Sequence, residues 1–227
     1  MTSESHAQVS QRTPLRRAPL IAGILIAFVC FAGFWEIAED FADSPAVLAF
    51  DTGVTNAVVA WRAPTTTLLM RGVTTTGGTL IVTVLTTALV ITLWRRRHAF
   101  AVSAVVAIAG GALMANLMKD KFGRVRPSAE NALVALPISL SFPSGHSMGS
   151  ACLAGVLIYL TLRSAMGPTS KIAIAAGLVL WAFAVGLSRV YLGVHWPSDV
   201  VASWLLGMGW LALLIGYSEA RRAVPQS

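Results

Sequence analysis

Two histidines with polar and charged neighbours are the residues of this sequence best suited to chemistry. His195 is followed four residues later by Asp199, in a pattern S-R-x5-H-x3-D that begins at Ser188. A carboxylate at this spacing can reach back to the imidazole and accept its Nδ1–H, which leaves Nε2 free to attack an electrophile. His146 ends the segment Pro143-Ser-Gly-His and is the natural second histidine, positioned to protonate a leaving group.

Basic residues accompany both histidines. Lys119 and Arg126 form the pattern K-x6-R-P, and Arg189 belongs to the segment that holds His195. Arginine grips phosphate in a bidentate manner and lysine acts as a mobile point charge, so three converging cations could neutralise a phosphoryl group during transfer. Ser144 and Gly145 precede an apolar run, where the free N–H groups of a helix start bind phosphate well. These five residues are the candidate phosphate ligands.

The composition indicates that these residues sit on a membrane protein. Of 227 residues, 56% are hydrophobic and 12% are charged, whereas soluble domains carry about 25% charged residues. The apolar runs are continuous rather than alternating, which favours helices over a barrel. The net charge of +7 comes mostly from residues that flank these runs, so membrane topology explains it better than nucleic-acid binding.

Six apolar runs approach the roughly 20 residues that a spanning helix needs. They are about Pro19–Trp35, Gly77–Trp94, Ala99–Met118, Ser147–Leu162, Ile172–Leu187 and Val200–Tyr217. A cleaved signal peptide is the competing interpretation of the first run, but no convincing small-residue cleavage site follows it. The sequence therefore predicts an all-α, six-span membrane domain over residues 18–218, a disordered tail over 1–17 and a second tail over 219–227.

The segment 36–76, between the first two spans, is mixed in character. Its acidic residues Glu36, Glu39, Asp40 and Asp43 follow helical spacing, which favours a solvated helix end over a metal site because no His or Cys joins them. Residues 51–70 suit one or two short interfacial helices. Whether this segment helps to select substrate is open. The two cysteines, Cys30 and Cys152, fall within apolar runs and are expected to be unpaired.

The basic residues also predict an orientation. Alternating spans place ten Lys and Arg residues on the side of both termini and seven on the other, so the termini are expected in the cytoplasm. Residues 119–143 and 188–199 then face outward from the cell membrane. Lys119, Lys121, Arg124 and Arg126 lie within eight residues on that disfavoured side, which suggests an anionic substrate.

Taken together, the three segments resemble the signature of the type-2 phosphatidic acid phosphatase superfamily. The matching positions are Lys119, Arg126, Pro127, Pro143, Ser144, Gly145, His146, Ser188, Arg189, His195 and Asp199. The resemblance implies a six-helix bundle that hydrolyses a lipid phosphate or diphosphate without metal or cofactor. It also implies a phosphohistidine on His195, with His146 as acid and then base and Asp199 orienting the nucleophile. Small bacterial members often act on phosphatidic acid, phosphatidylglycerophosphate or undecaprenyl diphosphate.

Three other classes of function fit the sequence less well. A transporter or channel commonly carries charged groups inside its spans, and the predicted spans contain no Asp, Glu, Lys or Arg. A soluble haloperoxidase with the same pocket is disfavoured by six apolar spans, and a noncatalytic relative by the intact signature. The sequence does not choose among the candidate lipids, and it fixes no oligomeric state.

Overall fold

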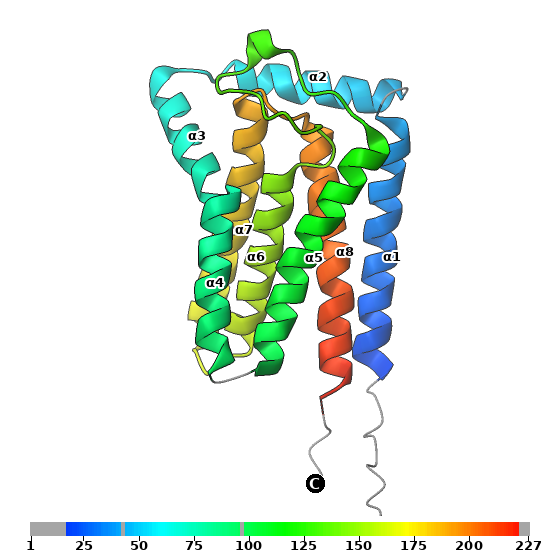
Figure 1. The fold of residues 1–227 in the computed structure, drawn as a ribbon, viewed down its shortest axis with the longest axis vertical. Helices are drawn as coiled ribbons and strands as arrows, with labels where there is room; N and C mark the ends of the chain where they lie inside the picture. The colour runs from blue at the N-terminus through cyan, green and yellow to red at the C-terminus, as the bar shows by residue number, and fades with distance from the viewer. Residues whose placement is uncertain (1–16, 42–43, 96–97, 223–227) are drawn as a thin grey trace, which may run out of the picture.

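The protein is described by a computed structural model over residues 17–41, 44–95 and 98–222. Across these residues it forms eight α-helices and one 3₁₀ turn, with no strand (Figure 1). The helices are α1 (Arg17–Asp40), α2 (Pro45–Val59), α3 (Pro64–Thr76), α4 (Thr79–Trp94), α5 (His98–Phe122), α6 (Gly145–Leu162), α7 (Pro168–Tyr191) and α8 (Pro197–Ala220), and the 3₁₀ turn η1 is Ala129–Asn131. The predicted all-α class is confirmed. Asp43 and the tail 1–16 lie outside the described residues.

Five of the described helices, α1 and α5 to α8, are long and apolar enough to cross a membrane. The helices α3 and α4 meet at a bend of 44° and together make a sixth candidate span. Counting this bent pair as one span gives the six that the sequence predicts. The bend lies at Gly77 and Gly78, and paired small residues are a common cause of such kinks.

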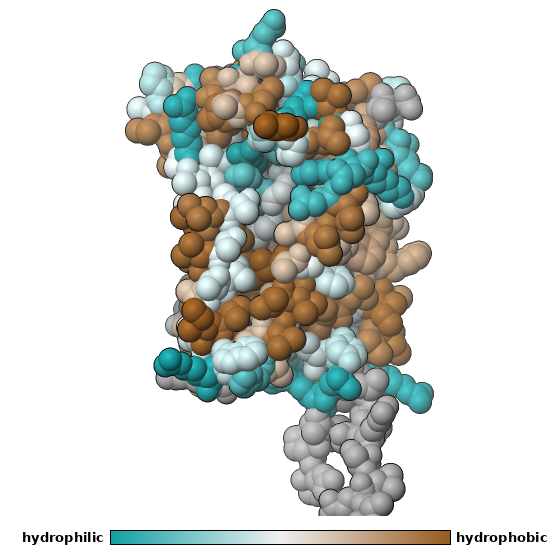
Figure 2. Space-filling model, viewed as in Figure 1, coloured by the Kyte–Doolittle hydropathy of each residue, from teal (hydrophilic) through white to brown (hydrophobic). Residues whose placement is uncertain are grey.

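The surface of the bundle is that of a membrane protein. Large apolar side chains are exposed along α1, α4 and α7; Phe28, Leu80 and Ile172 are 71%, 74% and 69% exposed. A water-soluble protein rarely exposes so much contiguous apolar surface. Figure 2 shows apolar side chains over the middle of the bundle, with hydrophilic ones gathered towards both ends. Apolar groups in this arrangement face lipid.

Small residues let the central helices approach closely. A Cβ added to Gly23 in α1 would lie 2.6 Å from the carbonyl oxygen of Ala212 in α8, and one added to Gly155 in α6 would lie 2.4 Å from Leu211 Cδ1. Close packing at small residues stabilises helices in lipid. Gly145 in the first turn of α6 differs, because a Cβ there would meet nothing within 4 Å.

Four helix ends gather at one end of the bundle. The ends of α5 and α7 and the starts of α6 and α8 lie beneath α2, while α1 begins and α8 ends at the opposite end (Figure 1). Lys119 and Arg189 therefore lie in the last turns of α5 and α7, and Asp199 lies in the first turn of α8. The span boundaries predicted from the sequence placed all three in loops, because the first and last turns of these helices are less apolar than their middles.

Candidate active site

His195 lies in the short connection between α7 and α8, and both helix ends are capped. At the end of α7, Gly193 N donates to Val190 O at 2.9 Å and Val194 N donates to Arg189 O at 3.1 Å, which is the Schellman pattern. Gly193 takes the left-handed conformation that this motif requires, with φ of +73°. The capped end of α7 therefore fixes the backbone that leads into His195.

Asp199 performs two tasks at the start of α8. Its carboxylate accepts the backbone N–H of Trp196 at 3.0 Å, as a helix-capping residue does. The same oxygen, Oδ2, lies 3.2 Å from His195 Nδ1 and also accepts the hydroxyl of Ser141. Because an ionised carboxylate only accepts, Nδ1 must be the protonated ring nitrogen, and Nε2 then carries the lone pair.

The imidazole of His195 is kept neutral. It is 3% exposed, and burial is the main reason that its pKa is lowered to about 4, with the charges of Arg126 and Arg189 adding to the effect and Asp199 opposing it. A neutral imidazole at pH 7 whose Nε2 carries no proton has the protonation state that a nucleophile needs.

The guanidinium of Arg126 contacts Nε2 of His195. Its Nη1 lies 3.0 Å from that nitrogen and donates to Val194 O at 2.6 Å, and its Nε donates to Ser139 O at 2.8 Å. This guanidinium thus joins the loop before α6 to the segment of His195. A phosphoryl oxygen that binds here would take over the N–H now directed at the imidazole.

Arg189 is a buried cation with an unsatisfied donor. Its side chain comes from the last turn of α7, is 5% exposed, and donates from Nη1 to Thr74 Oγ1 of α3 at 2.7 Å. Its Nε has no hydrogen-bond partner within the described part of the chain. Buried donors are nearly always paired, so this one indicates a position where an anion is expected.

Lys119 has a different environment from the one expected of a free phosphate ligand. Its ammonium donates to the carbonyl oxygens of Leu140 at 2.6 Å and Pro143 at 2.7 Å, and lies 3.4 Å from that of Ser141. It therefore fixes the loop that leads into α6. To contact phosphate it would exchange one of these carbonyls for a phosphoryl oxygen, and its assignment as a ligand stays a prediction.

The start of α6 brings the second histidine to the same place. Ser144 is the N-cap of the helix, and its oxygen accepts from the backbone N and the hydroxyl of Ser147. The space beside the Gly145 backbone is open, as anion binding at a helix start requires. His146 is half-buried, and its imidazole lies within range of the positive charges of Arg189, Arg126 and Lys119.

Sequence reasoning missed two residues that lie behind His195 and Asp199. Arg124 donates to Asp199 Oδ1 and to Asp51 Oδ2, each at 2.6 Å. Asp51 is 2% exposed and comes from α2. A signal was present, because Asp51 is the one charged residue in the otherwise uncharged stretch Pro45–Val59, and a lone acid among apolar residues at a membrane calls for a partner.

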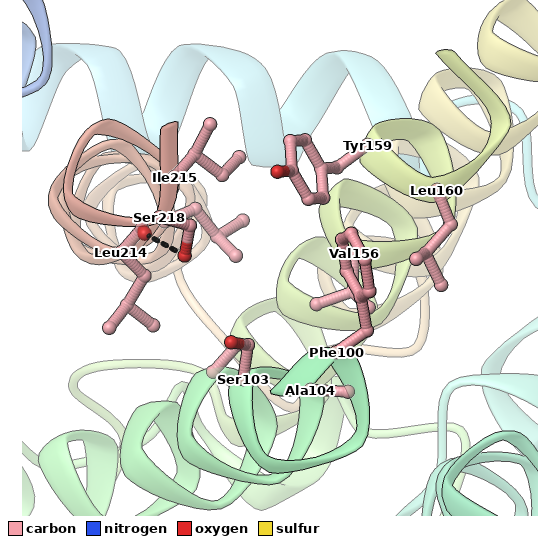
Figure 3. A pocket seen from close by; sticks show the side chains of 11 residues that line it. Phe100, Ser103, Ala104, Val156, Tyr159, Leu160, Leu214, Ile215 and Ser218 are labelled. Atoms are coloured by element: carbon pink, nitrogen blue, oxygen red, sulfur yellow. Dashed lines mark hydrogen bonds between the residues drawn. The ribbon is translucent and has the colours of Figure 1, made fainter. Parts of the chain in front are cut away.

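A largely apolar groove on the outer surface of the bundle leads to the site. It has a volume of about 350 Å³, lies between α4, α5 and α6, and is lined by residues that include Val82, Ile108, Gly145 and Gly149. A second cavity, shown in Figure 3, lies at the opposite end of the bundle near Tyr159. Its volume of about 30 Å³ holds little more than water. The groove, by contrast, reaches Gly145 at the start of α6 and could place a lipid chain beside the two histidines.

Comparison with known proteins agrees with this architecture. Residues 100–223 match the PAP2 superfamily. Phosphatidylglycerophosphatase B of Bacillus subtilis is 32% identical over 178 residues, which cover 77% of this chain and 86% of that protein. Undecaprenyl-diphosphatase of Sulfolobus acidocaldarius is 29% identical over 129 residues, or 58% of its length.

A solved structure extends the likeness to the fold. The transmembrane PAP2-type phosphatidylglycerolphosphate phosphatase from Bacillus subtilis superposes with a TM-score of 0.77 at 29% identity, over 85% of this chain and 96% of that one. The resemblance expected from the sequence is thereby confirmed. This chain belongs to the PAP2 superfamily and is a multi-pass membrane lipid phosphatase.

Proposed function

We propose that the chain hydrolyses a lipid phosphate or diphosphate through a phosphohistidine on His195, without a metal ion. Nε2 attacks phosphorus to form the N–P bond as the P–O bond to the lipid breaks, and His146 gives its proton to the departing oxygen. Water then attacks the phosphohistidine, His146 takes a proton from it, the N–P bond breaks and phosphate leaves. The observation that carries this proposal is the neutral, buried His195, whose Nδ1 lies against Asp199 and whose Nε2 lies 3.0 Å from a cation.

The phosphoryl oxygens are held by groups that converge on the same place. Arg126 and Arg189 are the main ligands, since one already contacts Nε2 and the other has an unpaired buried donor. The N–H groups at Gly145 and the hydroxyl of Ser144 add neutral donors, and Lys119 supplies a third cation. Fixed donors and cations of this kind stabilise the charge of the transition state.

The hydrolysed phosphate is proposed to belong to a lipid whose tail stays in the bilayer. The apolar groove between α4, α5 and α6 reaches Gly145, so a tail lying there brings its headgroup to the start of α6. Phosphatidylglycerophosphate and undecaprenyl diphosphate are candidates because relatives are named for these substrates, and phosphatidic acid is a third. The excess of basic residues on the side of the termini supports a cytoplasmic location for them and an outward-facing site.

The nucleophile is tested by substitution in the purified, detergent-solubilised protein. The parent protein is expected to form an acid-labile, base-stable phosphoenzyme when its reaction with a ³²P-labelled substrate is quenched. His195→Ala is expected to abolish both this phosphoenzyme and phosphate release. His146→Ala is expected nearly to abolish release. His98→Ala is the matched control, since His98 lies at the other end of the bundle against Trp94. Hydrolysis that persists in His195→Ala would reject the assignment. Solute flux in liposomes containing the inactive protein would favour a transporter instead.

The groove is tested with lipids that differ in the length of their tails. Gly149→Leu places a side chain in the groove, whereas Gly177→Leu places the same side chain on the exposed surface of α7, where a Cβ meets nothing within 4 Å. The first variant is expected to raise KM for a long-chain phosphate and leave that for a short-chain analogue unchanged. The second is expected to match the parent protein. Equal effects on both substrates would rule out the groove as the tail site. The same panel, with monophosphate and diphosphate headgroups, identifies the preferred lipid class.

A further inference from the structure

A buried chain of charges runs from α2 to the carboxylate behind His195. Arg124 donates from Nη2 to Asp51 Oδ2 and from Nη1 to Asp199 Oδ1, each at 2.6 Å. Asp51 also accepts the backbone N–H of Ser198 at 2.8 Å and the hydroxyl of Ser198 at 2.7 Å. The three charged side chains are all buried. Asp199, which contacts His195, is thus the end of a network that starts 148 positions earlier in the sequence, at Asp51.

Arg124 is not arranged as a substrate ligand. Both of its terminal nitrogens are directed at carboxylates, and Nη1 also contacts the Ser198 hydroxyl at 2.7 Å. Its guanidinium lies over the ring of Phe41, 4.7 Å from the centroid, and 5.7 Å from that of Trp196. A guanidinium that contacts aromatic rings and bridges two carboxylates has little freedom to move. The side chain is fixed behind the imidazole, on the far side of Asp199.

The charge of the network suits a nucleophilic histidine. The imidazole gains positive charge as Nε2 binds phosphorus, and Asp199 must compensate it. If Arg124 faced Asp199 alone, its charge would oppose that compensation at close range. Asp51 shares the guanidinium, so the three groups together keep one net negative charge while Asp199 stays fixed in orientation.

We propose that Arg124 and Asp51 are positioning residues for the pair His195 and Asp199. Arg124 prevents the Asp199 carboxylate from rotating away from Nδ1, and Asp51 balances the charge of Arg124. The helix α2, which lies across the end of the bundle (Figure 1), thereby becomes part of the catalytic apparatus. This inference rests on the proposed role of His195 as nucleophile.

Removing either charge is expected to slow the reaction and to move the protonation of His195 in a defined direction. In metal sites, loss of a partner one step behind a ligand typically costs about 10–100-fold in activity, and by analogy we expect kcat to fall by that order in Asp51→Asn and Arg124→Gln. Arg124→Gln removes a positive charge near the imidazole, so the acidic limb of kcat/KM is expected to move up from about pH 4. The double variant, which removes both charges, is expected to bring the limb part of the way back.

The other groups facing His195 are the same in all these variants. They are Asp199 of α8, Arg189 of α7, His146 of α6, and Arg126 and Ser141 of the loop before α6. Arg124→Lys keeps the charge but has a single nitrogen, so the limb is expected to stay near that of the parent while kcat falls. Glu130→Gln is the matched control, since it removes an exposed carboxylate at the same end of the bundle and is expected to change neither quantity.

Each variant is purified full-length, and its thermal unfolding is compared with that of the parent before kcat, KM and the pH profile are measured. The inference is supported if kcat falls in Arg124→Gln and the acidic limb of its kcat/KM profile moves to higher pH, and if that limb moves part of the way back in the double variant. Parent-like kcat in folded Asp51→Asn overturns it, and so does a limb that does not move in folded Arg124→Gln. If Arg124→Gln does not fold, Asp51→Asn and Arg124→Lys decide by their kcat. Activity in His195→Ala would defeat the proposed function itself, whereas inactive His195→Ala with parent-like Asp51→Asn defeats this inference alone.

Discussion

Gly193 is the position where a single methyl group tests how His195 is held. Its φ of +73° costs an alanine about 1–2 kcal/mol relative to glycine. The new Cβ would lie 2.4 Å from the carbonyl oxygen of Asn131, where ordinary contact begins at 3.4 Å, so one backbone must move by about 1 Å. Asn131 belongs to η1, and the nearby bond from Leu133 N to Leu192 O, 3.0 Å long, limits its retreat. A misplacement of about 1 Å at a reacting group can cost about 100-fold in rate.

The assay compares phosphate release and thermal unfolding in Gly193→Ala with two control variants. Gly123→Ala carries the same left-handed penalty, with φ of +63°, but its Cβ meets nothing within 4 Å. Gly177→Ala introduces a methyl group on an open helix surface. We expect the large loss in kcat in Gly193→Ala. Gly123→Ala is expected to lower the unfolding temperature without that loss, and Gly177→Ala is expected to show neither effect. Parent-like kcat in Gly193→Ala, or an equal loss in Gly123→Ala, would refute the reasoning.

Three further outcomes are expected. Because the pKa of His195 is lowered to about 4, the imidazole stays neutral from pH 7 down to that value, and the loss of kcat/KM that comes from protonation of His195, corrected for substrate ionisation, should be centred near pH 4; a loss centred near 6.5 would contradict the buried, neutral nucleophile. Thr74→Val removes the side-chain acceptor that holds Arg189 Nη1 at 2.7 Å, and losing about 1–2 kcal/mol of positioning raises KM about 5–30-fold, whereas Thr75→Val, whose hydroxyl bonds only its own helix among the described contacts, should match the parent. A chelator should leave hydrolysis intact and vanadate should inhibit it, and loss of activity in EDTA that added metal restores would overturn the metal-free mechanism.

The meeting of the three chemical segments could be predicted from the sequence for a topological reason. Two complete spans, about Ser147–Leu162 and Ile172–Leu187, separate the segment of Lys119 from that of His195. Two crossings return the chain to the side it left, so the segments had to share a face of the membrane. The pairing of His195 with Asp199 followed from their spacing of four residues, and the structure places Nδ1 3.2 Å from the carboxylate.

The partners of these residues could not be predicted, because they depend on the path of irregular chain. The loop 123–144 has little regular structure, and its course alone decides that Lys119 contacts backbone carbonyls and that Arg126 reaches Nε2. Arg124 was one of four basic residues within eight, and nothing in that cluster distinguished it from Lys121, which lies over the ring of Trp35. The Thr-rich α3 was too polar to be recognised as an extension of α4.

The cations around His195 serve binding and protonation at once. Burial lowers the pKa of the His195 imidazole most, and the charges of Arg126 and Arg189 lower it further, so in the proposed mechanism the side chains that attract a phosphate also help to keep the nucleophile unprotonated before it arrives. In the proposed mechanism we expect a bound phosphoryl group to neutralise both guanidinium groups and to draw the Arg126 N–H away from Nε2, so that the lone pair would be exposed when a substrate is present. The positive charge that the ring gains on attack then faces an anionic phosphoryl group on one side and Asp199 on the other. Catalysis in this arrangement depends on charges that change partners while the backbone that holds them stays fixed.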